Sequence, residues 1–329
     1  MDNLQKKLKQ YGTVVILLVM IVFFAIMAPN FRTMNNLITV LRQVSMLGIL
    51  SVGLTFVFLL GDIDLSVGVM MGLSATTSAL LMAKLGVPVA LSWILGIVVC
   101  TVVGIINGLV VTTTRMPALI ATLGTQNIIY GINYMICGGV SVYGIPESAK
   151  VLGQGYLFGV LPIPVLIMVL VFLVGGFILK RTYYGRYFYA VGGNAEATRL
   201  SGINTTKVKI LAYSLCGLCA GIAGAINMSR ANSGQPTAGH GYEMDVITAC
   251  VVGGISAGGG DGKMSGVISG VLIIGVLSNG MTIMGISDYW QMVAKGLVLV
   301  LAVGMDYYQK TKVKKARLTD VKPAAEAKS

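Results

Sequence analysis

The chain has 329 residues, of which 55% are hydrophobic and 11% are charged, and its mean hydropathy is +0.83. A soluble globular domain carries roughly 25% charged residues, so this composition excludes an ordinary water-soluble protein. The formal net charge of +12 does not require a nucleic-acid partner, because the basic residues gather near the ends of apolar stretches, where an anionic membrane surface attracts them.

Stretches long enough to cross a bilayer recur along the whole chain. We predict an all-α polytopic membrane protein with about ten transmembrane helices, each needing about 20 mostly apolar residues. The predicted spans are 12–28, 36–60, 66–83, 88–112, 118–138, 163–179, 207–228, 243–258, 265–284 and 289–306. The first is longer than the apolar core of a cleavable signal peptide, so it is interpreted as a retained span. The short breaks at 61–65 and 259–264 leave re-entrant segments open at both places.

Basic residues divide unequally between the two sides of this arrangement. Most lie at the N-terminus, in the 180–209 loop and beyond residue 309, whereas the predicted outer loops contain Arg32, Lys84, Lys150 and Arg230. Because Lys and Arg accumulate in cytoplasmic loops, we expect both termini in the cytoplasm. The predicted domains are a transmembrane domain over 1–309 and a basic cytoplasmic tail over 310–329.

Glycine is abundant, with 43 residues, and small residues four positions apart allow helices to pack closely. The segments 61–72 and 260–270 both begin with Gly-Asp and continue into a Gly-x-x-x-Gly pair, which is Gly68/Gly72 in the first. This parallel indicates a possible internal repeat of two related halves. Chance similarity remains the alternative, since glycine is so frequent.

Asp62 and Asp64 precede the predicted helix that contains Gly68 and Gly72. Asp64 or Ser66 can cap the free amides of this helix, and the carboxylates stabilise the positive end of its dipole, so helix capping is the first interpretation. A proton or sodium site is the alternative, although two carboxylates at the inner edge do not make a mid-membrane acidic relay. We therefore predict a structural or gating role for these four residues.

The fifth predicted span concentrates polar side chains at helical spacing: Gln126, Asn127, Tyr130, Asn133 and Tyr134. Gln126, Tyr130 and Asn133 share one face. Neutral amides and hydroxyls beside an aromatic ring suit a sugar, which exchanges hydrogen bonds with water for hydrogen bonds with side chains. The five residues are predicted to line a translocation path, and hydrogen bonding between helices is the alternative.

Three further charged residues near or within the predicted spans could have a functional role. Glu243 and Asp245 follow an outer loop and are interpreted as helix caps or as contacts to a receptor. Lys295 lies deep in the last span, and we expect an acidic or carbonyl partner for it that the sequence does not identify.

No motif indicates catalysis or a bound cofactor. The segment 257–264 resembles a phosphate-binding loop, but Ala257 replaces its first Gly and Met264 its final hydroxyl residue. Cys216 and Cys219 have the spacing of a metal site, but His240 is the only histidine and no second cysteine pair lies nearby. We expect no catalytic residue and no metal, and a partner subunit or an ion gradient must supply the energy.

The predicted inner loop 180–209 contains signals for a short helix outside the membrane. Asn194 is a favourable N-cap, Glu196 and Ala197 suit a first helical turn, and Gly202 suits a C-terminal stop. We predict a cytoplasmic helix at about 193–203 that a soluble partner can bind.

The sequence Glu196-Ala-Thr-Arg-Leu-Ser-Gly202 resembles the ATPase-docking motif of binding-protein-dependent ABC importers. Together with the segments 61–68, 120–125, 235–239 and 250–254, it resembles the bacterial monosaccharide (ribose-type) permeases of that class, from about residue 30 to residue 308. The resemblance implies a type II importer bundle and an ATPase-docking coupling helix. The residues it assigns to docking are Gly193, Asn194, Glu196, Ala197, Arg199, Leu200 and Gly202.

The resemblance also implies a location and a set of partners. These are the bacterial inner membrane with its lipids, a second permease subunit that we expect to be an identical copy, a twin-domain ATPase that binds ATP and Mg²⁺, and a periplasmic sugar-binding protein. The implied cargo is a monosaccharide, with ribose as the first candidate. An ion-coupled secondary sugar transporter or channel that works without an ATPase is the alternative.

Overall fold

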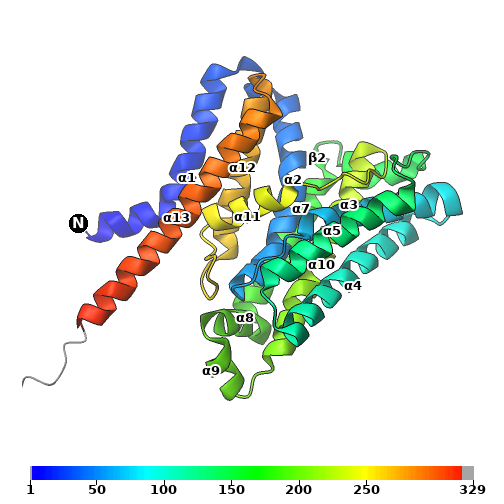
Figure 1. Cartoon of the computed structure of the whole chain (residues 1–329). Coiled ribbons are helices and arrows are strands. Elements are labelled where there is room, and N and C mark those ends of the chain that lie inside the picture. The colour runs from blue at the N-terminus through cyan, green and yellow to red at the C-terminus, as the bar shows by residue number, and fades with distance from the viewer. Residues whose placement is uncertain (1, 321–329) are drawn as a thin grey trace, which may run out of the picture.

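The computed structural model describes the backbone of residues 2–320 and the side chains of residues 12–308. It is almost entirely helical, which confirms the predicted all-α class (Figure 1). The elements are α1 (Asp2–Met27), η1 (Pro29–Arg32), α2 (Met34–Leu59), α3 (Val67–Leu85), α4 (Val89–Thr114), α5 (Ala118–Cys137), η2 (Glu147–Lys150), α6 (Val151–Gln154), β1 (Tyr156–Leu157), β2 (Leu161–Pro162), α7 (Ile163–Arg181), α8 (Tyr183–Gly193), α9 (Ala195–Leu200), α10 (Thr205–Ala231), α11 (Tyr242–Val252), α12 (Met264–Ile283) and α13 (Asp288–Asp320). The two strands form an antiparallel hairpin that pairs Tyr156 with Pro162.

A helix stands at each of the ten predicted spans. Seven helices of the described chain are long and apolar enough to cross a membrane: α2, α3, α4, α7, α10, α12 and α13. The described apolar part of α1, Gly12–Met27, is shorter. α11 differs most from its predicted span at 243–258, because it has 11 residues. At 1.5 Å per residue it is about 16 Å long, roughly half of the hydrocarbon thickness.

α2 and α10 lie at the centre of the bundle. Nearly every side chain from Val44 to Leu60 in α2 is buried, and α10 packs against α2, α3 and α4. Glycines permit this packing, since a Cβ at Gly217 would overlap the Cys100 carbonyl and a Cβ at Gly104 would overlap the Tyr213 carbonyl. The predicted role of spaced glycines in close helix packing is confirmed here.

The two Gly-Asp segments suggested as a repeat meet each other in the fold. The amide of Gly260 donates to the Leu59 carbonyl at 3.0 Å, and a Cβ at Gly259 would lie 2.6 Å from the Gly61 nitrogen. After each segment a helix begins, α3 or α12, whose first glycine pair lies against backbone carbonyls of a neighbouring segment. The Gly68/Gly72 pair of α3 and the Gly266/Gly270 pair of α12 therefore have similar surroundings.

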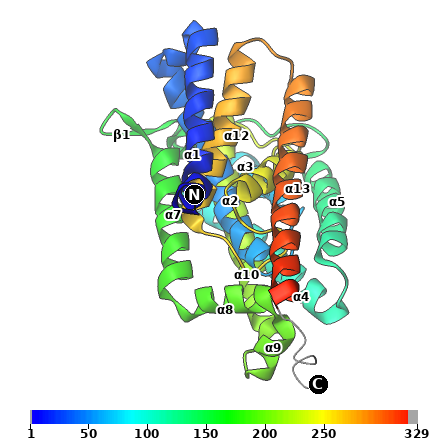
Figure 2. The ribbon, with the colours of Figure 1, turned by 90° about the vertical axis from the view of Figure 1, so that its left-hand side faces the viewer.

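Two views show how the ends of the molecule differ. α8 and α9 lie at one end, and η1 lies with the turn between α12 and α13 at the other (Figure 1). Figure 2 shows α12 beside α13, with α5 at the right-hand edge of the view. The predicted docking helix and the predicted path helix thus belong to different parts of the fold.

Candidate docking and translocation sites

The short helix predicted at about 193–203 is present as α9 (Ala195–Leu200). Asn194 caps it as expected, because its side chain accepts a hydrogen bond from the Ala197 amide at 2.9 Å. Gly202 has φ +85°, a left-handed conformation that favours glycine, directly after the helix. Gly193, which belongs to the predicted docking set, is the last residue of α8.

The side chains of α9 face outward. Thr198 is buried, whereas Ala197 and the charged pair are exposed, and Leu200 is 76% exposed. Glu196 and Arg199 form an ion pair at 2.6 Å, and this hydrogen bond lowers the pKa of the Glu196 carboxyl. An exposed pair of this kind contributes little to stability. A surface that exposes a large apolar side chain beside two charges is suited to binding a partner.

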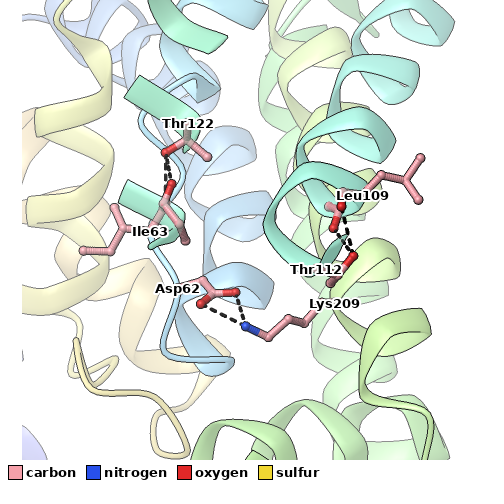
Figure 3. A network of polar contacts seen from close by, with 8 residues as sticks. Asp62, Ile63, Leu109, Thr112, Thr122 and Lys209 are labelled. Carbon is pink, nitrogen blue, oxygen red and sulfur yellow. Dashed lines mark hydrogen bonds and ion pairs between the residues drawn. The ribbon is translucent and has the colours of Figure 1, made fainter. Parts of the chain in front are cut away.

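A cavity of about 580 Å³ opens beside α9. It is bounded by α9, the corner between α4 and α5, and the first turns of α10, and its lining includes Glu196, Arg115 and Thr205. Asp62 and Lys209 also line it, and they form an ion pair of 2.8 Å (Figure 3). α9 therefore shares a cavity with the loop that precedes α3.

Of the two predicted caps, Asp64 bonds to the free amide directly before α3, whereas Ser66 makes no cap bond of its own. Asp62 pairs with Lys209 of α10, and the fully buried Asp64 accepts hydrogen bonds from the amide and hydroxyl of Ser66, at 2.9 and 2.6 Å. Ser66 stands at the N-cap of α3 without a side-chain cap bond. Gly61, with φ +81°, takes a left-handed conformation at the start of this loop, directly after α2.

Thr122 of α5 fixes the same loop from the other side. Its hydroxyl donates to the Ile63 carbonyl at 3.1 Å and accepts from the Leu65 amide at 3.2 Å (Figure 3). The loop 60–66 is thus bonded to both α5 and α10.

α8 connects α9 to both Gly-Asp loops. The Tyr189 hydroxyl donates to the Gly262 carbonyl at 2.8 Å. A Cβ at Gly192 would overlap the Leu59 carbonyl, so α8 lies directly on the end of α2. α8 therefore lies between α9 and the segments that precede α3 and α12.

The structure brings together part of the set predicted on α5. Gln126 donates to the Glu243 carboxylate at 2.9 Å, and Asn133 makes a longer bond of 3.4 Å to the Val69 carbonyl. Tyr130 and Tyr134 share a hydrogen bond of 3.2 Å between their hydroxyls. Asn127 does not join them, because it is exposed and donates to the Leu123 carbonyl of its own helix.

An irregular segment at 232–241 completes this region. Its Ala238 and Gly239 carbonyls lie against Gly72 and Gly68, where no Cβ would fit, which explains the glycine pair of α3. Irregular backbone at membrane depth occurs where it is buried in protein or lines a water-filled cavity. The segment leads into the half-helix α11.

The sequence did not assign His240 or Glu243 to the path. The His240 ring lies 4.7 Å from the Tyr130 ring, between centroids, and Glu243 is 5% exposed. One Glu243 oxygen, Oε2, has no hydrogen-bond partner among the described residues. An acidic residue deep in a membrane protein is itself a signal of function, and that signal identifies Glu243.

Lys295 finds its expected acidic partner in Asp245. Their side chains pair at 2.7 Å and are 21% and 18% exposed. The pair joins α13 to the half-helix α11. Within the described residues no group of three or more His, Cys, Asp or Glu could hold a metal ion.

Comparison with known proteins assigns the family. Residues 36–303 match the family described as "Branched-chain amino acid transport system / permease component". The chain belongs to this permease family. It is therefore a transport subunit and not an enzyme.

Several curated relatives are similar over nearly their whole length. The chain is 43% identical over 306 residues to the ribose import permease protein RbsC of Escherichia coli (strain K12), covering 91% of this chain and 94% of the relative. It is 41% identical over 307 residues to RbsC of Bacillus subtilis (strain 168), covering 93% and 94%. It is 40% identical over 303 residues to the L-arabinose transport system permease protein AraH of Escherichia coli (strain K12), covering 91% of each. No solved structure matches the chain.

Proposed function

We propose that this permease is the membrane subunit of an ATP-driven, binding-protein-dependent importer that moves a monosaccharide into the cell, with ribose as the first substrate to test. The main support is the similarity to two ribose permeases over more than nine tenths of this chain. The arabinose permease is only slightly less similar, at 40%. Identity therefore favours the sugar class more strongly than the particular sugar.

The energy enters through α9. A twin-domain ATPase binds α9 at its exposed surface of Glu196, Arg199 and Leu200, and ATP and Mg²⁺ bind to that partner. Hydrolysis displaces α9, and α8 passes the displacement to the loops at 60–66 and 253–263 through the Tyr189 bond and the close contact at Gly192. The ion pair between Asp62 and Lys209 holds the first loop to α10 during this motion.

The sugar passes along the face that α5 shares with α11. Gln126, Tyr130 and Asn133 supply hydrogen-bonding groups, and Glu243 supplies a carboxylate oxygen without a partner in the described chain. Tyr130 and His240 supply stacked rings for the apolar face of the sugar. Because α3 and α11 begin beside each other, a shift of the loop at 60–66 changes access to this face.

The working assembly contains two copies of the permease in the bacterial inner membrane, with α9 and both termini in the cytoplasm. A periplasmic sugar-binding protein delivers the cargo at the opposite end. The exposed apolar side chains of α4, α7 and α13 suit contact with lipid or with the second copy. The basic tail at 310–329 lies beyond the matched region.

Uptake by the purified parts tests this proposal. Proteoliposomes containing the permease and its ATPase, with the receptor outside and ATP inside, receive labelled ribose, arabinose, xylose or leucine. We expect uptake of ribose or another of these sugars and none of leucine, whose class is named in the family description. Uptake of leucine without uptake of any sugar would contradict the proposed substrate class.

A further inference from the structure

A second polar site lies on the other side of α11. A cavity of about 180 Å³ opens between α2, α11, α12 and α13. The paired side chains of Asp245 and Lys295 line it, together with Gln43, Tyr242, Ser278 and Gln291. Ligand pockets for drug-sized molecules span roughly 300–1,000 Å³, so this cavity suits a smaller ligand of about one ring.

The cavity lies within the membrane-spanning part of the chain. Lys295 is seven positions after Asp288, which places it about 10 Å along α13 at 1.5 Å per residue. Charged groups at such a depth are costly, and a partly buried ion pair is weak support for stability. An apolar pair would hold α13 to α11 with less desolvation, so the charges indicate a function beyond packing.

The lining offers both donors and acceptors. Asp245 has acceptor oxygens, Lys295 has donor hydrogens, and Tyr242, Ser278 and Gln43 provide both kinds of group. Gln291 is fixed in place, because its amide donates to the Thr282 hydroxyl at 3.1 Å and to the Ile286 carbonyl at 3.2 Å. These bonds, together with the Asp245–Lys295 pair, hold the side of the cavity formed by α11, α12 and α13.

The charge balance selects the ligand class. Among the described lining residues, Asp245 and Lys295 are the charged ones, and their charges cancel. A charged ligand would leave one side of this pair without compensation, whereas a neutral polyhydroxylated ring can bond to both. Gly275 also shapes the space, since a Cβ there would overlap Val44, and both residues line the cavity.

We propose that this cavity binds a neutral monosaccharide as a station on the transport route, separate from the α5 face by the width of α11. The proposal rests on the proposed function of the chain as a sugar permease. In the bound state Asp245 accepts and Lys295 donates hydrogen bonds to neighbouring hydroxyls, and Gln43 and Ser278 bond to the ring from α2 and α12. The site makes α11 a half-helix with a sugar-binding group on each side.

Protection of an introduced thiol tests the site in the complete importer. Ser278→Cys places a thiol in the cavity, while the five native cysteines are all buried. A small hydrophilic thiol reagent modifies it in proteoliposomes that contain the ATPase and the receptor. We expect ribose to slow the modification in a saturable way, and glycine betaine at equal osmolarity to leave the rate unchanged.

A second substitution separates binding from structure. Gln43→Leu in the Ser278→Cys background should raise the half-protecting ribose concentration by about tenfold, the effect of losing one buried hydrogen bond. Glu147→Gln, which breaks an exposed ion pair with Lys150, is the matched control and should not change that concentration. If Gln43→Leu does not assemble with the ATPase, Gln43→Asn, which shortens the side chain and keeps the amide, replaces it.

The results of these experiments separate a failure of the proposed sugar site from a failure of the proposed transport function. A wild type that transports ribose while Ser278→Cys shows no protection, or equal protection with and without the Gln43 change, overturns the site alone. A wild type that transports none of the tested monosaccharides overturns both the proposed function and the site.

Discussion

The proposed docking region at α9 and the proposed sugar-binding region around α11 are built in different ways. The docking end, α9, is formed by one short stretch of chain, with exposed side chains and a single exposed ion pair. The region around α11 is assembled from α5, α13 and the irregular segment 232–241, and its Glu243 and Asp245 are mostly buried. Substitutions in α9 should therefore change binding of a partner without unfolding the permease, whereas substitutions around α11 should change stability and transport together.

The largest effect is expected from Glu196→Lys. It replaces a 64% exposed side chain, so folding should be unaffected, but it reverses a charge at the centre of the proposed interface. We expect at least about 30-fold weaker binding of the ATPase, equivalent to about 2 kcal/mol. Co-purification and titration with the ATPase measure this loss. Glu147→Lys, at an 85% exposed position far from α9, is the control, and unchanged binding in Glu196→Lys would contradict the docking role.

Gln126→Leu should have the next largest effect, and on stability. It leaves the buried Glu243 carboxylate without its amide donor, which costs about 1.5 kcal/mol for a part-buried hydrogen bond to a charged group. A lower midpoint of thermal unfolding in detergent measures this cost. Asn127→Leu changes the same kind of side chain one residue later, where the amide is exposed, and should shift the midpoint much less. Equal shifts in both variants would show that the bond to Glu243 has no special weight.

Lys209→Met should have a smaller effect because its partner Asp62 retains some contact with water. We expect a loss of stability of about 1 kcal/mol and slower uptake with unchanged ATPase binding. Lys207→Met, at an exposed position in the same helix turn, is the control. If exchange of the two charges, in Asp62→Lys with Lys209→Asp, restores no uptake, the ion pair does not hold the loop as described.

The smallest effect is expected from pH near neutrality. The hydrogen bond from Arg199 lowers the pKa of Glu196, so the carboxylate stays charged at every pH above the ordinary range of glutamate, about 4.3. Its favourable contribution is present above that range and is lost as pH falls through the lowered value. ATPase binding should therefore stay constant between about pH 6 and 8. A steep change in that interval would mean that another group controls docking.

The sequence allowed the docking end to be predicted because its signals are local. Asn194 and Gly202 act on neighbouring backbone groups, and the structure contains the cap and the left-handed turn at these positions. The long spans were predictable for the same reason, since hydropathy depends on consecutive residues. Hydropathy thus predicted that these helices exist, but it did not predict how they pack against one another.

The region around α11 was not predictable because its contacts join distant parts of the chain. The ion pair between Asp62 and Lys209 of α10, for example, joins residues 147 positions apart. Hydropathy also hid the short length of α11, because residues 253–258 after it carry no charge, although the adjacent glycines Gly253 and Gly254 were a signal of a break. The pairing of Lys295 with Asp245 required the fold itself.

The source of energy is the most direct test of the central claim. Labelled ribose uptake is measured in proteoliposomes that contain the permease, its ATPase and the receptor, with internal ATP or with a sodium or proton gradient and no ATP. The account predicts uptake with ATP alone, lost in Glu196→Lys. Uptake by the isolated permease under an ion gradient without ATP would contradict it and would favour a secondary transporter.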